Sequence, residues 1–218
     1  KMLPEGSELH LGILNTLRSW NFFEIPNSVD SNSNVGGFGI DGDISSLIGA
    51  SLCNPNRIYI GIFGDLAFFY DLNSLGNRHV GNNVRIMLIN NAVGAEFKLS
   101  AHPCYAFLDD ADKYMAAAGH YGAKSPVLVK HFSEDLGFQY LSATNKEEFL
   151  TALETFTNPN ITDKPMILEV FTTHENENEA LNLMTSITMG SKQKVADAIR
   201  SVAGEKGIKA IKSILGKK

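Results

Sequence analysis

Two polar side chains stand where predicted strands end. Asp65 follows the apolar run of residues 58–63 and one glycine, and Asn91 follows the apolar run of residues 84–89 and another asparagine. A carboxylate and an amide oxygen are hard donors suited to Mg²⁺, which proteins usually hold through few side chains together with substrate phosphates. The pair therefore points to a diphosphate bound through its metal ion.

The segments around these residues explain how the two side chains could meet. Both apolar runs have the length and the β-branched content of buried strands, and a helix-like segment lies between them. Parallel strands joined by a helical crossover place their carboxyl ends at one edge of the sheet, where open α/β sheets bind ligands. We therefore expect Asp65 and Asn91 to lie side by side. The backbone N–H groups that would face the anion are those of Gly64, Leu66 and Ala67.

Ordinary turn chemistry is the alternative explanation for both dipeptides. Gly-Asp after a strand is common, and Asn-Asn is frequent in turns. Either dipeptide alone is more often structural than functional. Their occurrence together, each closing a predicted strand and separated by one crossover, favours the metal and diphosphate site.

The same motif carries a resemblance to a known family. Gly64-Asp65, the crossover and Asn90-Asn91 resemble the metal and diphosphate motif of thiamine diphosphate-dependent enzymes, whose usual opening is Gly-Asp-Gly. Leu66 replaces the third glycine. This departure, with the Tyr-Asp-Leu-Asn sequence that follows, is similar to the menaquinone-pathway synthase that joins 2-oxoglutarate to isochorismate, and more broadly to acetolactate synthase-like proteins.

A glycine-rich loop extends the resemblance. Residues 33–42, SNVGGFGIDG, resemble the cofactor loop of that synthase. The resemblance implies that Asn34, Gly39, Ile40 and Asp41 bind the cofactor. It further implies that Ile40 supports the bent form of the cofactor near its pyrimidine ring. Glycines here let the backbone approach a ligand without a Cβ in the way.

Further roles are implied by the family pattern. The peptide carbonyl of Val93 would be the third protein ligand of the metal, and Gly94 and Glu96 would lie near the reacting carbon of the cofactor. Glu96 is then a candidate acid or base, with a surface salt bridge as the alternative.

His10 is a candidate substrate contact, because the synthase has a substrate-binding serine close to this point. The alternative is a partly exposed helix histidine. Val35 stands where the synthase has a substrate-binding arginine, so the same dicarboxylate substrate is not implied.

The likeness covers most of residues 7–175 and implies the fold. We expect an α/β domain over residues 1–175, with a doubly wound, mostly parallel sheet and helices on both faces. Residues 176–218 are expected to form a basic amphipathic helical tail. Such a tail can bind a membrane surface or an acidic partner. We expect instead a closing helix packed on its own or a sister subunit.

The remaining expected elements follow from periodicity and turn signals. Asn145 is expected to cap a helix, with Glu148 as its capping-box partner. The others are helices over residues 9–17 (ending near Trp20), 43–52, 116–122 and 127–136, a helix start at 109–112, strands over 27–31, 138–141 and 165–171, and an acidic joint over 174–179.

Composition limits the classes of protein that need to be considered. The chain has 218 residues, 44% hydrophobic and 20% charged, which is ordinary for a globular domain. Its net charge of -5 argues against a nucleic-acid binder. The two cysteines, Cys53 and Cys104, form neither a metal motif nor a disulfide framework. No signal peptide and no apolar run of about 18 residues is visible, so we expect a cytoplasmic protein without membrane contact.

The resemblance implies a lyase or transferase that uses thiamine diphosphate and Mg²⁺ to decarboxylate a 2-oxo acid or to join it to an acceptor. In this family an amino-terminal pyrimidine-binding domain supplies the activating glutamate. We therefore expect this chain to be the final domain of a homodimer or homotetramer, and to be inactive alone. The alternatives are a nucleotide- or diphosphate-binding domain and a non-catalytic interaction module. The lack of a Walker lysine motif opposes nucleotide transfer, and retention of Asp65 and Asn91 opposes a degenerate module.

Overall fold

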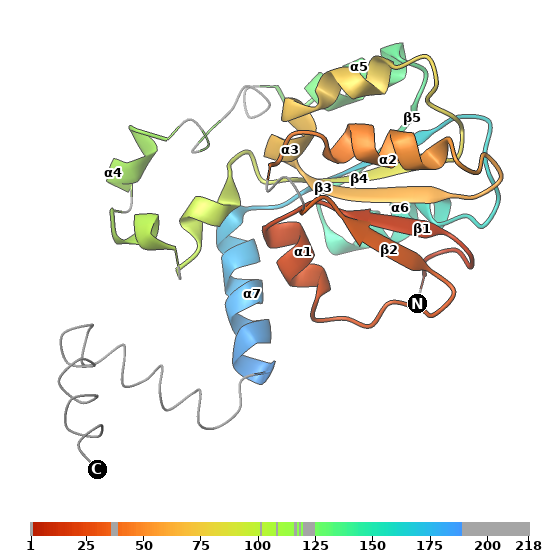
Figure 1. Ribbon diagram of the computed structural model, residues 1–218. Helices are drawn as coiled ribbons and strands as arrows, with labels where there is room; N and C mark the ends of the chain where they lie inside the picture. The colour runs from red at the N-terminus through yellow and green to blue at the C-terminus, as the bar shows by residue number, and fades with distance from the viewer. Residues whose placement is uncertain are drawn as a thin grey trace. The chain divides into compact units, whose positions relative to one another are not determined.

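A six-stranded parallel sheet forms the centre of the computed structural model, which describes residues 2–35, 39–100, 102–107, 109–115, 117, 119 and 125–188 (Figure 1). The strands are β1 (Glu8–Leu11), β2 (Asp30–Ser33), β3 (Tyr59–Gly64), β4 (Val84–Asn90), β5 (Gln139–Ala143) and β6 (Met166–Phe171). Their order across the sheet is β2-β1-β3-β4-β6-β5, and every neighbouring pair is parallel. The predicted parallel α/β architecture is confirmed.

Helices connect the strands in chain order. The α-helices are α1 (Asn15–Trp20), α2 (Asp43–Ser51), α3 (Asp65–Tyr70), α4 (Asp109–Asp112), α5 (Leu128–Asp135), α6 (Lys146–Phe156) and α7 (His174–Thr188). Short 3₁₀ helices occupy η1 (Leu72–Gly76), η2 (Ala95–Lys98) and η3 (Pro103–Phe107).

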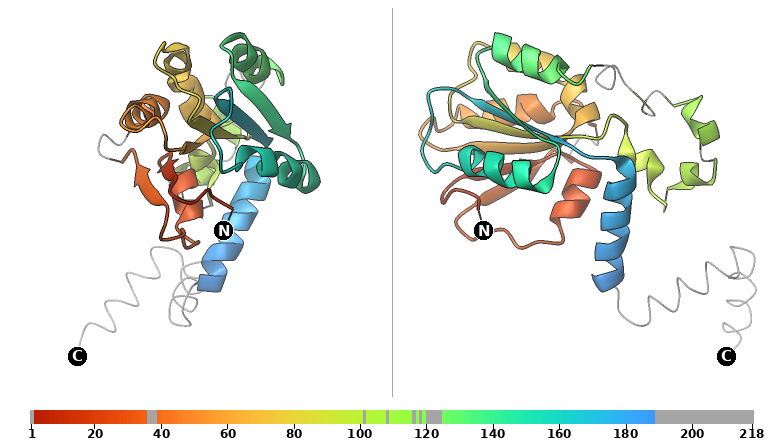
Figure 2. Two further views of the ribbon diagram at one scale, coloured as in Figure 1. Left: turned by 90° about the vertical axis from the view of Figure 1, so that its right-hand side faces the viewer. Right: turned by 180° about the vertical axis from the view of Figure 1, so that it is seen from behind.

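Both faces of the sheet are covered (Figures 1 and 2). On one face, α2, α3 and α5 pack through Leu47, Phe68 and Val129 against β3 and β4. On the other face, α1 and α6 pack through Leu17 and Phe156 against β1, β3 and β6. Central parallel strands buried on both sides need apolar residues at successive positions, which explains the continuous runs in β3 and β4.

The strand order changes direction between β1 and β3. From β1 the chain crosses to β2 at one edge of the sheet, and from β3 it winds towards β4 and the opposite edge. A change of this kind leaves a crevice beyond the carboxyl ends of the two strands, which is the usual ligand site of doubly wound sheets. The residues just after β1 and β3 therefore border the expected ligand position.

The helix expected over residues 9–17 is wrong. Leu9 and Leu11 lie in β1, and only the stretch that ends at Trp20 is helical, as α1. Leu9, Leu11 and Ile13 alternate at a spacing of two, and all three are buried, which is the pattern of a strand rather than of a helix face. Leu14, with φ of 67°, separates the strand from the helix.

Most other elements agree with expectation. The strand expected over residues 27–31 is shifted to β2, and the joint expected over 174–179 is wrong, because these residues form the first turns of α7. In the stretch 116–122 only residues 117 and 119 are described, and residues 189–218 of the expected tail lie outside the described part.

The predicted cap at Asn145 is confirmed. The Glu148 N–H donates to Asn145 Oδ1 at 3.0 Å. The Glu148 carboxylate, however, accepts the N–H of Thr144, at 2.8 Å, instead of that of the cap residue itself. The capping box therefore closes one residue earlier than the sequence pattern implies.

The chain divides into two compact units, Lys1–Asn178 and Glu179–Lys218. The first unit contains the whole sheet and the residues of the candidate site. Of the second, the described residues 179–188 continue α7. None of the helices in the described ranges has both the length and the apolar character needed to cross a bilayer.

Arg85 anchors the amino-terminal end of β4. Its guanidinium is fully buried and donates to the carbonyl oxygens of Phe156, Asn158 and Asn160 at 2.7, 2.6 and 2.7 Å. These carbonyls lie at the end of α6 and in the loop after it, where a helix leaves acceptors without helical partners. Arg85 therefore ties the central strand β4 to that loop.

Replacing this anchor should destabilise the whole domain. We expect Arg85→Met to lower the free energy of unfolding by about 3 kcal/mol, because three buried carbonyl oxygens lose their charged donor. Urea unfolding followed by circular dichroism measures the change. The exposed Arg78→Met variant serves as control, and equal stability of the two variants would contradict the assignment.

Candidate metal and diphosphate site

Asp65 lies at the carboxyl end of β3, as predicted. It is the first residue of α3, and its side chain is 2% exposed. Gly64, in extended conformation, carries the chain from strand to helix. The Leu66 N–H donates to Asp65 Oδ1 at 2.7 Å, so this amide orients the carboxylate in the structure described here.

Asn91 follows β4 in a tight turn. Its Oδ1 accepts the Val93 N–H at 3.1 Å, and the Asn90 Oδ1 accepts the Ala92 N–H at 3.1 Å. Ala92 between them has φ of 66°, in the left-handed region that non-glycine residues rarely adopt. These consecutive Asx turns fold the Asn91 side chain onto the peptide unit of Val93.

The loops after β3 and β4 touch each other. β3 and β4 are paired in parallel, with Gly64 opposite Ile89. A Cβ on Gly94 would lie 3.1 Å from Leu66 Cδ2 and 2.8 Å from Ala117 Cβ. The close contact requires glycine at this position, and it places the loop that carries Asn91 directly beside the start of α3.

Glu177, near the start of α7, contacts Asn91. Asn91 Nδ2 donates to Glu177 Oε2 at 2.9 Å. Burial raises the pKa of Glu177, hydrogen bonds from Thr172 and Asn91 oppose that increase, and the negative charge of Asp65 adds to it. The Glu177 carboxylate thus accepts a hydrogen bond from Asn91 and is affected by the charge of Asp65.

Glu169, in β6, is a second carboxylate that sequence analysis missed. It is 1% exposed and accepts Asn90 Nδ2 and the Tyr140 hydroxyl, both at 2.6 Å. Burial raises the pKa of Glu169, and the Asp65 charge raises it further against the effect of these hydrogen bonds. One charged residue inside the apolar strand sequence MILEVF was the available signal. Glu177, in a polar stretch, offered none.

Negative charge therefore accumulates at this edge of the sheet. Within the described residues, Glu169 and Glu177 form no ion pair with a basic side chain. The same residues contain no group of three or more His, Cys, Asp or Glu side chains that could hold a metal ion. A metal held here would need the amide and peptide oxygens that the sequence predicts, since Asp65 is the one carboxylate in the predicted set.

The predicted cofactor loop is described only at its two ends. Asn34 Nδ2 donates to the Asp41 carbonyl at 3.5 Å, which brings the two ends together, and Gly42, with φ of 96°, begins the turn into α2. Gly39 and Ile40 are half-buried, and Asp41 is exposed. Residues 36–38 lie outside the described part of the chain.

Asp43 is a functional candidate that sequence analysis missed. It is 2% exposed, and neither carboxylate oxygen has a hydrogen-bond partner among the described residues. Its Oδ2 lies 3.0 Å from where a Cβ on Gly12 would be, between the ends of β1 and β3. Burial raises the pKa of Asp43 to about 7. The nearby Asn34 side chain opposes this increase, and the charges of Asp71 and Asp41 add to it.

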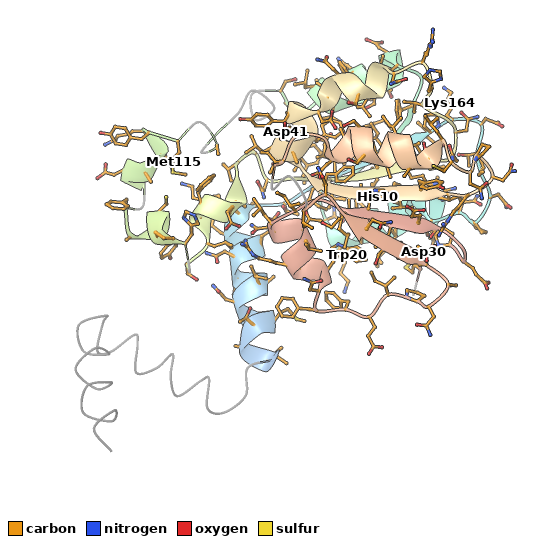
Figure 3. All side chains as sticks on the ribbon, in the orientation of Figure 1. His10, Trp20, Asp30, Asp41, Met115 and Lys164 are labelled. Atoms are coloured by element: carbon orange, nitrogen blue, oxygen red, sulfur yellow. The ribbon has the colours of Figure 1, made fainter. Side chains whose placement is uncertain are left out.

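His10 and Glu96 have structural partners. His10 lies within β1, opposite Gly61, and its Nε2 is 2.9 Å from Glu8 Oε1 (Figure 3). Glu96 forms an ion pair with Arg18 of α1, the alternative that was foreseen for this residue. Neither contact gives direct support to a role in substrate binding or proton transfer.

The fold and the residues at this edge of the sheet indicate the class of protein. A doubly wound, fully parallel sheet with a buried aspartate and an asparagine at the ends of β3 and β4 is consistent with the thiamine diphosphate-binding fold. No family model matches the chain.

Comparison with known proteins then identifies relatives, each named 2-succinyl-5-enolpyruvyl-6-hydroxy-3-cyclohexene-1-carboxylate synthase. The protein of Phocaeicola vulgatus is 36% identical over 181 residues, 83% of this chain and 31% of that protein. The protein of Bacteroides thetaiotaomicron is 32% identical over 194 residues, 89% of this chain and 33% of that protein. That of Christiangramia forsetii is 33% identical over 179 residues, 82% and 29% of the two chains.

These relatives confirm the resemblance inferred from the motif. The chain is homologous to 2-succinyl-5-enolpyruvyl-6-hydroxy-3-cyclohexene-1-carboxylate synthases over most of its length. It spans about a third of the length of the curated relatives that it matches.

The buried Asp43 should make stability depend on pH. Its pKa is 3.8 in the unfolded reference and about 7 in the fold, so the unfolded chain releases this proton first and stability falls as pH rises between these values. This decline in the free energy of unfolding amounts to up to about 4 kcal/mol, and we expect it to be absent in Asp43→Asn. Thermal melts from pH 4 to pH 8 measure it, with the exposed Glu24→Gln as control. An unchanged pH profile in Asp43→Asn would contradict the assignment.

Proposed function

We propose that this chain binds thiamine diphosphate through Mg²⁺ and forms the cofactor-binding part of a 2-oxo acid decarboxylase or carboligase. The proposed metal ligands are the Asp65 carboxylate, the Asn91 side-chain oxygen and the Val93 carbonyl. The homology to synthases supports the cofactor, and the motif supports the ligands.

The observation that carries the proposal is that the first two ligands follow adjacent parallel strands, whose carboxyl ends lie at one edge of the sheet. The loop after β4 also contacts the start of α3, where Gly94 lies against Leu66. The hydrogen bond from the Val93 N–H to the Asn91 amide oxygen supports Val93 as the proposed third ligand, because it holds the two residues together.

The chemistry of the donor set fits magnesium. All three ligands are hard oxygen donors, and they leave room for diphosphate oxygens and water in an octahedral shell. The carboxylates of Glu169 and Glu177 make the surroundings negative, which favours a divalent cation over an anion bound without metal. The metal ion would thus neutralise part of the negative charge of these carboxylates.

The residues of the chain would hold and orient the cofactor. The loop residues Asn34, Gly39, Ile40 and Asp41 are proposed to contact it, with Ile40 as an apolar support. Gly64, Leu66, Ala67 and Gly94 line the loops after β3 and β4, where the diphosphate is proposed to bind. When bound, thiamine diphosphate supplies the electron sink for loss of carbon dioxide from a 2-oxo acid.

The proposal includes partners outside this chain. Because the chain spans about a third of its relatives, we propose that an amino-terminal pyrimidine-binding domain completes the site and supplies the activating glutamate. A homodimer or homotetramer, a 2-oxo acid substrate and a cytoplasmic location stay predictions from sequence.

A non-catalytic diphosphate-binding module is the second candidate. The observation that favours it is that Glu96, the candidate acid or base, forms an ion pair with Arg18, and that His10, the candidate substrate contact, lies against Glu8. Such a module would bind the metal and diphosphate in the same way. Binding alone therefore supports both candidates, and turnover of a 2-oxo acid by the longest chain that contains this segment separates them.

Ligand-dependent stability tests the proposed site in the 218-residue chain. We expect Mg²⁺ with thiamine diphosphate, and Mg²⁺ with inorganic diphosphate, each to raise the melting temperature by about 5–11 °C. Saturation near 100 times Kd contributes about 2.7 kcal/mol to stability, and a domain of this size gains roughly 2–4 °C per kcal/mol. Chelation of the metal should abolish both shifts.

Matched variants connect the shift to the site. Asp65→Ala and the isosteric Asp65→Asn should both lose the stabilisation, because the buried carboxylate is the one charged ligand. Asp135→Ala, at the exposed end of α5, should keep it. Equal stabilisation of Asp65→Asn and the unmodified chain, or stabilisation by ATP to the same extent, would overturn the proposal.

A further inference from the structure

Glu177 connects three segments at the carboxyl edge of the sheet. Its Oε2 accepts Asn91 Nδ2 from the loop after β4, and its Oε1 accepts the hydroxyl of Thr172, just after β6. Its own N–H donates to the Thr173 carbonyl at 3.1 Å, which fixes the first turn of α7. Both carboxylate oxygens are thus engaged, and the side chain is half-buried.

An asparagine amide has two chemically different ends, and the surroundings of Asn91 distinguish them. A carboxylate can only accept hydrogen bonds, so Glu177 requires the Nδ2 end. The Val93 N–H can only donate, so it requires the Oδ1 end. A flipped amide would place oxygen against carboxylate and NH₂ against N–H. Glu177 and the Val93 peptide therefore select one orientation.

The preceding residue shows the same arrangement with another carboxylate. Asn90 Nδ2 donates to Glu169 at 2.6 Å, and its Oδ1 accepts the Ala92 N–H. The two asparagines thus bind different carboxylates, Glu169 and Glu177. Asn90 is buried and lies within β4, whereas Asn91 lies beyond the strand, where a ligand can reach it.

We propose that Glu177 is a positioning residue for the metal site, which holds the Asn91 amide with its oxygen towards residue 93 and the cation. This inference rests on the proposed function. Glu177 is not one of the proposed metal ligands, and its two oxygens accept hydrogen bonds from Asn91 and Thr172. Partners that orient a ligating group typically change metal affinity by about 10–100-fold when they are removed.

Metal affinity measured without turnover tests the proposal. Binding of Mn²⁺, a hard cation that substitutes for Mg²⁺, is followed by electron paramagnetic resonance in the full chain with inorganic diphosphate present. Glu177→Ala should weaken Mn²⁺ binding by about 10-fold or more. Glu177→Gln keeps an acceptor oxygen for Asn91 Nδ2 and should recover most of the affinity. Glu175→Gln, an exposed residue on the same turn, should leave the affinity unchanged.

A double-mutant cycle separates positioning from general destabilisation. In an Asn91→Ala background the amide is gone, so Glu177→Ala should cause no further loss of Mn²⁺ affinity. Circular dichroism melts confirm that each variant is folded at the temperature of measurement. Equal affinity of Glu177→Ala and the unmodified chain, equal losses in the Ala and Gln variants, or additive losses in the cycle would each overturn the inference. Failure of the unmodified chain to bind Mn²⁺ with diphosphate would instead overturn the proposed function.

Discussion

Parallel pairing of β3 with β4 is the constraint on which the candidate site depends. Because both strands end at the same edge, the residues that follow them lie at that edge although Asp65 and Asn91 are 26 positions apart in the chain. The crossover through α3 and η1 is covered by the same apolar core as the strands, so the geometry of the edge is supported by Phe68 and Leu75 far more than by the polar groups themselves. Apolar packing thus determines where the strand ends lie, and the polar residues at those ends are the proposed metal ligands.

Several buried acidic side chains lie near this edge of the sheet. Asp43, Asp65 and Glu169 are nearly inaccessible, and the pKa values of Asp43, Glu169 and Glu177 are raised mainly by burial. Burial of a carboxylate costs stability, and a bound cation can offset part of that cost. Under the proposed function, the stability of the domain and its affinity for a metal ion would therefore be linked.

The strand ends could be predicted because they depend on local signals. Apolar runs that stop at Gly64-Asp65 and Asn90-Asn91 are visible in the sequence, and so is the cap at Asn145. The segment around Leu9 was misassigned because the alternating Leu9, Leu11 and Ile13 are followed directly by Leu14 and Leu17, which extend the apolar pattern at a helical spacing. Glu169 and Glu177 could not be assigned, since their importance arises from contacts with residues more than 70 positions away. The proposed metal ligands remain a prediction that the geometry supports.

The buried guanidinium of Arg85 lies near the amino-terminal end of β4, while the asparagines stand at its other end. A single central strand thus carries a structural anchor at one end and the proposed ligand-binding loop at the other. Under the proposed function, substitutions that change the ligand would lie at the far end of the strand from the Arg85 anchor. Libraries confined to the loops after β3 and β4 would leave the hydrogen bonds between Arg85 and the loop after α6 in place.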